Sequence, residues 1–452
     1  MSAELLTALL GSDKVGEVRL ARGGRLRFAY EDAWRTRPGA VPLSLSMPLA
    51  AKEHGHDVID AFLWGLLPDN EAVLRRWGAR FQVSARNAYA LIAHVGEDCA
   101  GAVRFVRPER LAEAGTPPTR IEVEWLDEAD IASRLRTLRA DRAAWRIPAD
   151  TGQFSLAGAQ AKTALLRLDG RWGVPRGWTP TTHILKPRSD EFDGHVENEH
   201  LCLALARALE LPAAGSEVLW FEDQPATVVE RYDRLPTASL AAAAADAGDG
   251  DRAATLTALA TTQPILRVHQ EDLCQALGRP PTTKYQAEGG PTPASVADLL
   301  RSSSSRPLDD VRTFVDALAF NWLIGGTDGH AKNYSLLHAG AGRVRLAPLY
   351  DLGSALPYFQ MEERGLKLAM KVGGEYRLPN IDGRRWRKLA DELAIDPDDT
   401  IARIDALAAR LPDELEGVVN DMRERGLTHP VLDRLVVGLS LRVQACRRRL
   451  GA

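Results

Sequence analysis

The chain has 452 residues, of which 45% are apolar, and its formal net charge is -4. Since a domain usually holds about 100–200 residues, this length predicts two or three globular units, and the slight negative charge argues against a protein whose overall field alone attracts nucleic acid. The four cysteines stand far apart with no C-x-x-C pair, so neither a disulfide framework nor a zinc site is indicated. The N-terminus lacks a basic leader and no run of about 20 apolar residues follows, so we expect a cytoplasmic protein with no membrane partner.

Residues 1–108 predict a mixed β/α N-terminal subdomain. Two segments that alternate apolar and polar residues surround a glycine pair, which is typical of strands joined by a tight turn. A helical pattern then breaks at Pro68, where Asp69 or Asn70 can cap a second helix. One more strand is expected before the subdomain ends. In chain order, these segments are residues 15–20, 26–30, 60–77 and 102–106.

Residues 109–235 predict a second, β-rich unit. After a charged connector, the apolar period turns to two on both sides of a glycine-containing loop. A short strand that carries a lysine then leads into an amphipathic helix, and two more strands follow. These elements are expected at residues 163–168, 182–187, 196–211, 219–221 and 226–232.

The rest of the chain divides into two parts. Residues 236–262 are biased to Ala and Asp and hold almost no large apolar side chain, so they cannot bury enough surface to offset their ordering entropy. We interpret them as a mobile excursion. Residues 263–452 have mostly helical periodicity, so we expect a helical lobe.

The strongest functional signal is Thr-Asp-Gly-His-Ala-Lys-Asn at residues 327–333, followed by Asp351 at the end of an apolar run. Kinases use a carboxylate to deprotonate the attacking hydroxyl, and an amide and a second carboxylate to hold Mg²⁺. Asp328 has the spacing of the base, and Asn333 and Asp351 that of the metal ligands. A single Asp is more often a turn or capping residue, but the combination predicts phosphoryl transfer.

A loop at residues 155–163 lies upstream between two expected strands, where small residues let backbone N–H groups approach phosphate oxygens. Alone, this loop would be interpreted as a hairpin turn. Lys186 on a later strand matches the lysine that binds the α- and β-phosphates of ATP, and Glu197 or Glu199 could pair with it. We therefore expect the loop to cradle phosphates, through Ala157, Gly158, Ala159, Gln160 and Lys162.

Four further residues complete the predicted ATP site. Glu230 and Tyr232 lie where the small lobe would meet the large lobe, and backbone groups there would bind the adenine edge. His330 and Lys332 belong to the catalytic loop, and His330 is expected to orient this loop without transferring protons. The fold class that follows is α+β, with a protein-kinase-like two-lobed core, a β-rich N-terminal subdomain and a helical C-terminal lobe.

Short segments along nearly the whole chain resemble the HipA family of bacterial serine/threonine-kinase toxins from type II toxin–antitoxin systems. These segments follow one another in the same order as in the family, which makes the resemblance specific. They are residues 62–71, 95–101, 157–160, 182–186, 196–200, 269–272 and 328–333. The resemblance implies a HipA-like fold, with ATP and Mg²⁺ as cofactors and the catalytic, metal and lysine roles given above.

The resemblance further implies that Ser155 is the residue at which the chain autophosphorylates. A dianionic phosphate on Ser155 could not easily stay in a loop that cradles the phosphates of ATP, so this modification would act as an off switch. Two residues depart from the family pattern. Ala161 replaces a Glu, which changes the charge of the loop, and Gly326 replaces an Asn, which is expected to loosen the catalytic loop.

The resemblance also implies partners. They are a HipB-like helix-turn-helix antitoxin, operator DNA bound mainly through the antitoxin, and a protein substrate from the translation machinery, such as glutamyl-tRNA synthetase. Phosphorylation of that substrate would cause growth arrest and persistence. Two basic runs could face DNA, although each is more typical of a solvated helix face. They comprise Arg384, Arg385, Arg387 and Lys388, and Arg447, Arg448 and Arg449.

Two other functions remain open at this point. The chain could be a catalytically silent corepressor that acts with the antitoxin, although all the catalytic groups are present. It could also be a small-molecule or lipid kinase, because the Asp-x-His-x-x-Asn order differs from that of ordinary protein kinases.

Overall fold

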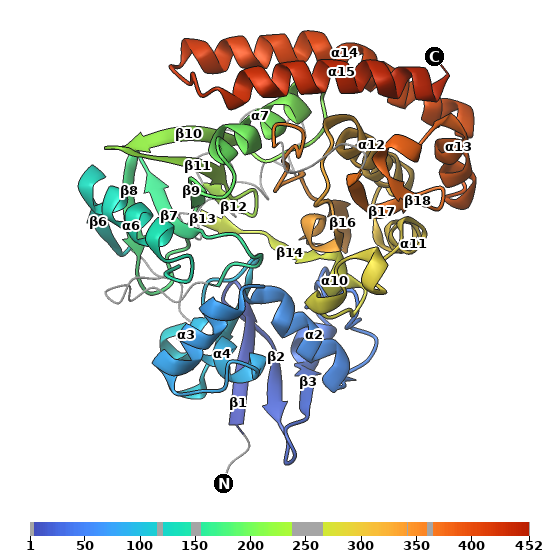
Figure 1. Ribbon diagram of the computed structural model, residues 1–452. Coiled ribbons are helices and arrows are strands. Elements are labelled where there is room, and N and C mark those ends of the chain that lie inside the picture. The colour runs from blue at the N-terminus through green and yellow to red at the C-terminus, as the bar shows by residue number, and fades with distance from the viewer. Residues whose placement is uncertain are drawn as a thin grey trace, which may run out of the picture.

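The computed structural model describes residues 4–114, 121–145, 155–236, 265–340, 342–358 and 365–451. Figure 1 shows the N-terminal subdomain at the bottom, a sheet and helices above it, and two long helices, α14 and α15, across the top. The described residues form three main hydrophobic cores, which lie in the N-terminal subdomain, against the sheet above it, and through the large lobe. Apart from Pro236, the expected excursion lies outside the described residues.

The N-terminal subdomain is an antiparallel sheet of five strands in the order β4-β3-β2-β1-β5, with helices packed against it. The expected hairpin and the late strand are confirmed, whereas the first strand was not expected, because its continuous apolar run has no alternation. The elements are β1 (Glu4–Leu10), β2 (Asp13–Leu20), β3 (Leu26–Tyr30), α1 (Asp32–Arg35), β4 (Glu53–His54), α2 (His56–Leu66), α3 (Glu71–Phe81), α4 (Ala88–Val95), β5 (Val103–Val106) and α5 (Leu111–Ala114).

The expected helix break at Pro68 is also confirmed. α2 ends at Leu66, and the side chain of Asn70 accepts hydrogen bonds from the amides of Ala72 and Val73, so Asn70 is the cap of α3. The turn between these helices points toward the middle of the molecule, where it reaches a loop of the next unit.

The second unit is an antiparallel sheet of six strands in the order β10-β11-β9-β7-β8-β6. Its elements include β6 (Val123–Leu126), α6 (Glu128–Ala140), β7 (Thr163–Leu168), β8 (Arg171–Pro175), β9 (His183–Pro187), α7 (His195–Ala208), β10 (Ser216–Phe221) and β11 (Gln224–Glu230). The connector therefore contributes the edge strand β6, which is too short and too exposed to show an apolar period. α6 covers the sheet with Ile131 and Leu135.

The large lobe is built on helices, as expected, but it also holds small sheets. Its helices are α10 (Leu273–Ala276), α11 (Pro293–Ser303), α12 (Pro307–Ile324), α13 (Gly383–Glu392), α14 (Pro397–Glu424) and α15 (Val431–Leu450). Its strands, with two that lead into it, are β12 (Arg234–Pro236), β13 (Ile265–Arg267), β14 (His269–Asp272), β15 (Ser335–Ala339), β16 (Arg343–Leu346), β17 (Lys367–Val372) and β18 (Glu375–Arg377).

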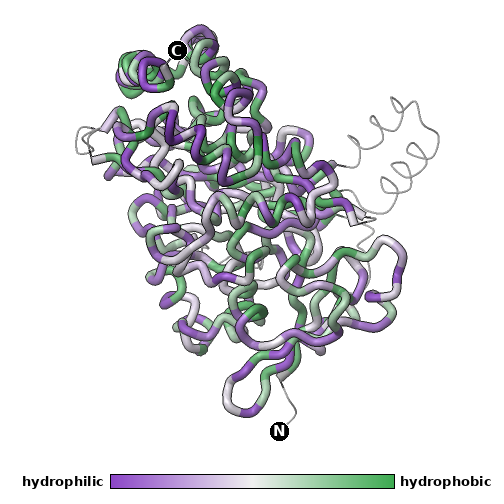
Figure 2. The backbone as a smooth tube through the Cα atoms, turned by 90° about the vertical axis from the view of Figure 1, so that its right-hand side faces the viewer, coloured by the Kyte–Doolittle hydropathy of each residue, from purple (hydrophilic) through white to green (hydrophobic). Residues whose placement is uncertain are grey.

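α14 continues through Pro412 and buries Leu415, Val419 and Met422 beyond it. Figure 2 shows hydrophilic and hydrophobic residues alternating along the helices near the C-terminus, as amphipathic packing requires. None of the helices in the described part of the chain combines the length and apolarity that crossing a bilayer would need.

Candidate active site

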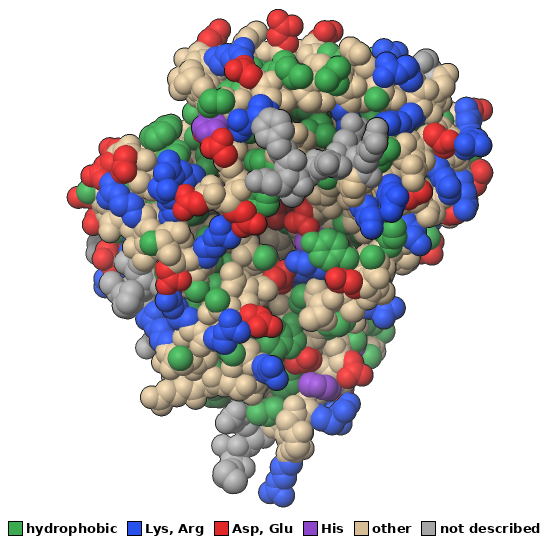
Figure 3. All heavy atoms as spheres, viewed as in Figure 1, with side chains coloured by type: hydrophobic (Ala, Val, Ile, Leu, Met, Phe, Trp, Pro, Cys, Tyr) green, Lys and Arg blue, Asp and Glu red, His purple; other side chains and the backbone are tan. Residues whose placement is uncertain are grey.

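A cavity of about 350 Å³ opens between the N-terminal subdomain, the unit with the six-stranded sheet and the large lobe, and residues from all three line it. Figure 3 shows a hollow near the middle of this face, with acidic and basic side chains gathered around it. Of the catalytic, metal-binding and ATP-binding residues named from the sequence, all line the cavity, whereas Ser155 and Glu197 do not. The rest come from the loop before β7, from β9 and β11, and from the loops around β15 and β16.

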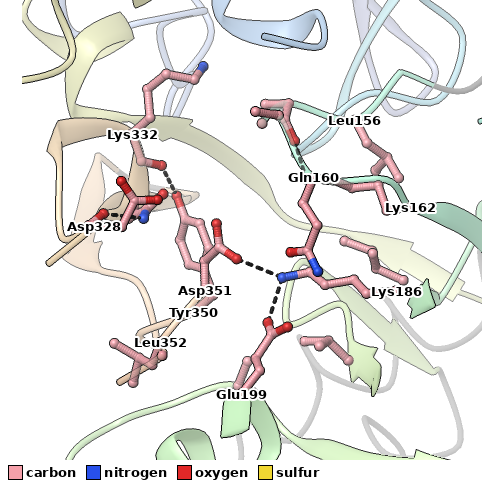
Figure 4. A pocket seen from close by; sticks show the side chains of 18 of the residues that line it. Leu156, Gln160, Lys162, Lys186, Glu199, Asp328, Lys332, Tyr350, Asp351 and Leu352 are labelled. Carbon is pink, nitrogen blue, oxygen red and sulfur yellow. Dashed lines mark hydrogen bonds and ion pairs between the residues drawn. The ribbon is translucent and has the colours of Figure 1, made fainter. Parts of the chain in front are cut away.

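Lys186 of β9 is the centre of the charged site. Its ammonium nitrogen lies 2.5 Å from Glu199 Oε1 of α7 and 2.7 Å from Asp351 Oδ1 (Figure 4). Burial alone would lower the pKa of Lys186, but the carboxylates of Asp351 and Glu199 more than offset it and raise this pKa above its usual value. Of the two glutamates considered for this pair, Glu199 is the one that makes it.

Asp351 reaches this pair from the large lobe in an uncommon backbone conformation. Its φ is +57°, in the left-handed region that Asp tolerates better than most residues. Burial would raise its pKa, but Lys186 and then Lys162 hold the pKa well below its usual range. Asp351 is therefore a carboxylate at any pH near neutrality, and it links the two lobes through Lys186.

The loop from Ser155 to Lys162 lies directly over this pair. Gly158 has a φ of +101°, and a Cβ atom there would stand 2.6 Å from Lys162 Nζ, so this position requires glycine. Lys162 Nζ donates a 2.6 Å hydrogen bond to the carbonyl of Ala157, and Gln160 contacts His195 of α7. Burial, with a further contribution from Lys186, lowers the pKa of Lys162 to about 8.

The N-terminal subdomain holds this loop through the turn after α2. The amide of Asp69 donates to the carbonyl of Gly158 at 3.0 Å, and Asn70 Nδ2 donates to the carbonyl of Ala159 at 3.4 Å. Closer to α2, the hydroxyl of Ser155 donates to the carbonyl of Leu66 at 2.7 Å. The Ser155 side chain is fully buried in this position, away from the cavity.

The catalytic loop follows α12 and places Asp328 at the mouth of the cavity. The carbonyl of Asp328 accepts hydrogen bonds from Asn333 Nδ2 and from the amide of His330, each at 2.7 Å. Its carboxylate is 64% exposed and accepts a 2.5 Å hydrogen bond from the hydroxyl of Tyr285. The Asp-to-Asn spacing seen in the sequence therefore corresponds to a hydrogen bond that closes the loop.

Gly326 is closely packed against Asn321 of α12. A Cβ atom at Gly326 would stand only 2.3 Å from Asn321 Oδ1, so the Asn321 side chain fills the space that a larger residue at position 326 would need. Asn321 Nδ2 also donates to the carbonyl of Ala317 and to Tyr334. The loop packs against α12 at this point, and the packing leaves room only for glycine at position 326.

His330 and Lys332 are buried residues of the same loop. Burial lowers the pKa of His330, so the ring is neutral near pH 7. Lys332 Nζ donates to the carbonyl of Gly65 and to Asp272, both at 3.0 Å. Figure 4 shows its ammonium pointing away from Lys186, so Lys332 joins the catalytic loop to the N-terminal subdomain.

Glu230 and Tyr232 line the cavity at the end of β11, where the chain leaves the small-lobe sheet. The amides of Glu230 and Arg231 already donate to the carbonyls of Gly215 and Thr182. Tyr232 donates to Gln270 at 2.5 Å, and its ring centroid lies 5.9 Å from that of Tyr350. These two rings provide an apolar wall beside the Lys186 pair.

An ionic cluster that the sequence did not reveal lies behind this hinge. Asp98 of the N-terminal subdomain pairs with Arg234 at 2.9 Å and Arg267 at 2.5 Å, while Asp233 accepts from Arg231 at 3.0 Å. All five side chains are at least nine-tenths buried. The arginines come from loops and short strands, where no periodic pattern marks them as buried, although Asp98 lies within a segment that resembles the HipA family.

Asp69, Lys284 and Tyr285 are further site residues that sequence reasoning missed. Asp69 and Lys284 line the cavity and form an ion pair at 2.9 Å, and Tyr285 contacts Asp328. The family-like segment that contains Asp69 was a usable signal. Lys284 and Tyr285 lie between proline and glycine residues in an irregular segment, which by itself favours only a loop.

The oxygen donors suit a divalent cation that prefers oxygen ligands. Asn333 uses its Nδ2 to bind the Asp328 carbonyl, which leaves its side-chain oxygen for a metal, and Asp351 adds a carboxylate. Within the described residues, no three His, Cys, Asp or Glu side chains come together as a metal cluster. Two protein ligands are a fitting number for a cation such as Mg²⁺, because it usually keeps waters and binds substrate phosphates.

Comparisons with known proteins agree with this geometry. The sequence matches the HipA N-terminal domain at residues 6–106 and the HipA-like C-terminal domain at residues 154–415. It is 36% identical over 400 residues to the putative kinase Y4mE of Sinorhizobium fredii, with 87% of each chain covered. It is 27% identical over 425 residues to the serine/threonine-protein kinase toxin HipA of Shewanella oneidensis, with 91% of this chain and 88% of that protein covered.

A solved structure has the same fold. It is that of Shewanella oneidensis HipA in a complex with HipB and operator DNA, with a TM-score of 0.77 at 24% identity, covering 98% of this chain and 97% of that one. This likeness confirms the expected α+β, kinase-like two-lobed fold. Since one family match spans more than half of the sequence and a second covers the N-terminal subdomain, the chain belongs to the HipA family.

Proposed function

We propose that this chain is a serine/threonine-protein kinase toxin of a type II toxin–antitoxin system that uses ATP and Mg²⁺. The observation that carries the proposal is the Lys186–Glu199–Asp351 triad, which joins the two lobes in the cavity that Asp328 and Asn333 also line. In kinases, a lysine paired with a helix glutamate and an aspartate that binds metal form the same set.

Each residue has a distinct task in this proposal. Asp328 accepts the proton of the attacking hydroxyl, and Lys186 binds the α- and β-phosphates while Glu199 keeps the lysine in place. Asn333 and Asp351 would hold the metal. ATP supplies the transferred phosphoryl group, and Mg²⁺ neutralises its charge. The loop from 155 to 162 covers the phosphates and excludes water.

Autophosphorylation of Ser155 would switch this kinase off. The Ser155 hydroxyl donates to the Leu66 carbonyl in a fully buried position, so the loop must leave this position before Ser155 can accept a phosphoryl group. A phosphorylated Ser155 could not return, because its dianion would face a carbonyl oxygen in a fully buried position. The phosphate-binding loop would then stay displaced from the cavity.

We further propose a HipB-like antitoxin as partner, since the Shewanella HipA of similar fold is bound to HipB and operator DNA. DNA contact would run mainly through that antitoxin. Four of the seven basic side chains in these two runs lie in ion pairs with acidic neighbours, which reduces the positive charge that they offer to DNA. These pairs are Arg384–Asp382, Arg387–Asp398, Lys388–Glu392 and Arg447–Asp405. The substrate we propose is a protein of the translation machinery, such as glutamyl-tRNA synthetase.

Incubation of the purified chain with γ-labelled ATP and Mg²⁺ tests the activity. We expect label in the chain, mapped to Ser155, and a loss of rate on the order of 10²–10⁴ in Asp328→Asn, because the base is removed. ATP binding by Asp328→Asn should remain. A wild-type chain that binds ATP and transfers no phosphate would instead support the catalytically silent corepressor.

Phosphoproteomics after a short pulse of expression would identify the target. Cells that express Asp328→Asn provide the control for secondary changes. The proposal requires a new phosphorylated serine or threonine on a translation protein in the wild-type sample only. New phosphate on a small molecule or lipid, with no protein target, would favour the third function considered from the sequence.

A further inference from the structure

Residues 281–290 form a strap beside the cavity, between α10 and α11, and Lys284 of this strap lines the cavity. The strap consists of two short 3-10 turns, Pro281–Thr283 and Gln286–Glu288, and ends at Gly290. The amide of Gly290 donates to the carbonyl of Tyr285 at 3.0 Å, and a Cβ atom at Gly290 would stand 2.1 Å from the carbonyl of Thr283. The strap is therefore closed tightly on itself, which limits the movement of Tyr285.

Two neighbouring residues of the strap bind different regions of the protein beside the cavity. Lys284 Nζ lies 2.9 Å from Asp69 Oδ2 of the N-terminal subdomain, while the Tyr285 hydroxyl lies 2.5 Å from Asp328 Oδ1 of the catalytic loop. The carbonyl of Lys284 also accepts a 3.2 Å hydrogen bond from the amide of Ala331. The strap is thus attached to the catalytic loop by both backbone and side chain.

Tyr285 makes the one hydrogen bond that the Asp328 carboxylate has within the described residues. The backbone of Asp328 is held by Asn333 and His330, but these bonds end at its carbonyl and leave the side chain free to rotate. The carboxylate is 64% exposed, so packing alone does not restrict it. Its orientation therefore depends on the phenol.

The Tyr285 ring is itself held in place. It meets the buried ring of His330 edge to face, with centroids 4.9 Å apart and planes at 81°. This contact gives His330 a structural task next to the base that agrees with the orienting role expected from the sequence. A phenol supported in this way can hold a carboxylate at one angle.

We propose that Tyr285 is a positioning residue for phosphoryl transfer, which holds Asp328 Oδ1 so that Oδ2 faces the acceptor hydroxyl. This inference rests on the proposed function, in which Asp328 is the base. A carboxylate has two oxygens and about four lone-pair sites, so one phenol donor leaves room for the acceptor. The phenol keeps its proton throughout, and the acceptor's proton goes to Oδ2.

The variant Tyr285→Phe tests this role because it removes only the hydroxyl and keeps the ring against His330. We expect the maximal rate of phosphate incorporation at saturating ATP to fall on the order of tenfold, since a misaligned base costs rate. The ATP concentration at half-maximal rate should stay within about twofold, because the bond does not touch the nucleotide site. An unchanged or faster maximal rate would overturn the proposal, and a faster rate would identify Tyr285 as a competitor of the substrate.

Tyr376→Phe is the matched control. Tyr376 also lies near a lysine, Lys371, but it contacts no site residue, so this variant should keep the wild-type rate. Crystal structures of wild type and Tyr285→Phe give a readout that needs no activity. We expect one Asp328 rotamer in the wild type and several in the variant, and an unchanged rotamer would contradict the proposal even if no transfer were detected. A wild type that transfers no phosphate would refute the proposed function and leave this comparison intact.

Discussion

The hydroxyl of Ser155 and the carbonyl of Leu66 share a 2.7 Å hydrogen bond that ties the loop of residues 155–162 to the N-terminal subdomain. Placing a carboxylate at this buried position would set two oxygens against each other without water, which costs several kcal/mol. We therefore expect Ser155→Asp to displace the loop and to weaken ATP binding roughly tenfold or more.

Ser155→Ala is the control for this prediction. It removes one hydrogen bond, at a cost of about 1–3 kcal/mol, but adds no charge, so the loop should stay over the cavity and ATP should still bind. Calorimetric ATP titrations and limited proteolysis of the loop would compare the two variants. Equal ATP affinity in Ser155→Asp and wild type would show that the loop does not depend on this contact.

Gly158 and Gly170 allow the effect of backbone strain to be separated from the effect of crowding. Both have positive φ, +101° and +75°, but a Cβ at Gly158 would meet Lys162 Nζ at 2.6 Å, whereas Gly170 has open space around it. Each alanine substitution should destabilise the fold by about 1–2 kcal/mol. Only Gly158→Ala should also weaken ATP binding, because Lys162 must move.

Thermal unfolding and ATP titration of both variants would check this difference. If Gly170→Ala weakened ATP binding as much as Gly158→Ala, the loss would reflect general destabilisation. The loop would then have no special role.

The parts of the site that belong to short sequence motifs could be predicted from the sequence, because those motifs follow one another in a known order. Lys186, Asp328, Asn333 and Asp351 stand at a spacing that kinases share and line one cavity, and the hairpin of β2 and β3 has clear alternation. The break at Pro68 was also readable, because proline and a capping residue end and restart a helix by local rules.

The remaining features depend on contacts between distant segments. Tyr285 reaches Asp328 across 43 positions, and Asp98 meets Arg267 across 169. Neither contact is marked by a periodic pattern in the sequence, because tertiary packing determines which residues a loop residue contacts. β6 joins the sheet for the same reason, since its pairing with β8 rather than its own residues makes it a strand.

Lys162 should take up a proton when ATP binds at alkaline pH. Its pKa in the free protein is about 8, lowered by burial and Lys186, so at pH 8.5 the side chain is mostly neutral. Polyphosphate near the ammonium favours the charged form and raises this pKa, so binding at pH 8.5 draws a proton from solution. The uptake should shrink toward pH 7, where Lys162 is already charged.

Calorimetry in two buffers with different heats of ionisation measures this proton uptake. The variant Lys162→Met should bind ATP more weakly and lose the uptake at pH 8.5. If wild type and Lys162→Met took up the same number of protons, another group would be responsible.

The buried Asp98 should stabilise the fold above the acid range. Burial would raise its pKa, but Arg267, Arg234 and Arg231 hold it far below the usual value. A carboxylate whose pKa is lowered on folding contributes stability above its unfolded pKa of about 3.9 and loses that contribution as the pH falls toward the folded value. Asp98→Asn leaves the arginines without this partner, so we expect a loss of about 3 kcal/mol between pH 5 and pH 8.

Urea unfolding of wild type and Asp98→Asn across pH 3 to 8 would measure the loss, and the difference should become smaller below about pH 4. Asp433→Asn is the control, because Asp433 pairs with Arg423 while 74% exposed and should cost under about 1 kcal/mol. A loss in Asp98→Asn that stayed constant down to pH 3 would mean that the amide disturbs packing and that the carboxylate's charge is not what stabilises the cluster. Because this cluster lies behind Tyr232, the same variant should also weaken ATP binding at pH 7, whereas Asp433→Asn should not.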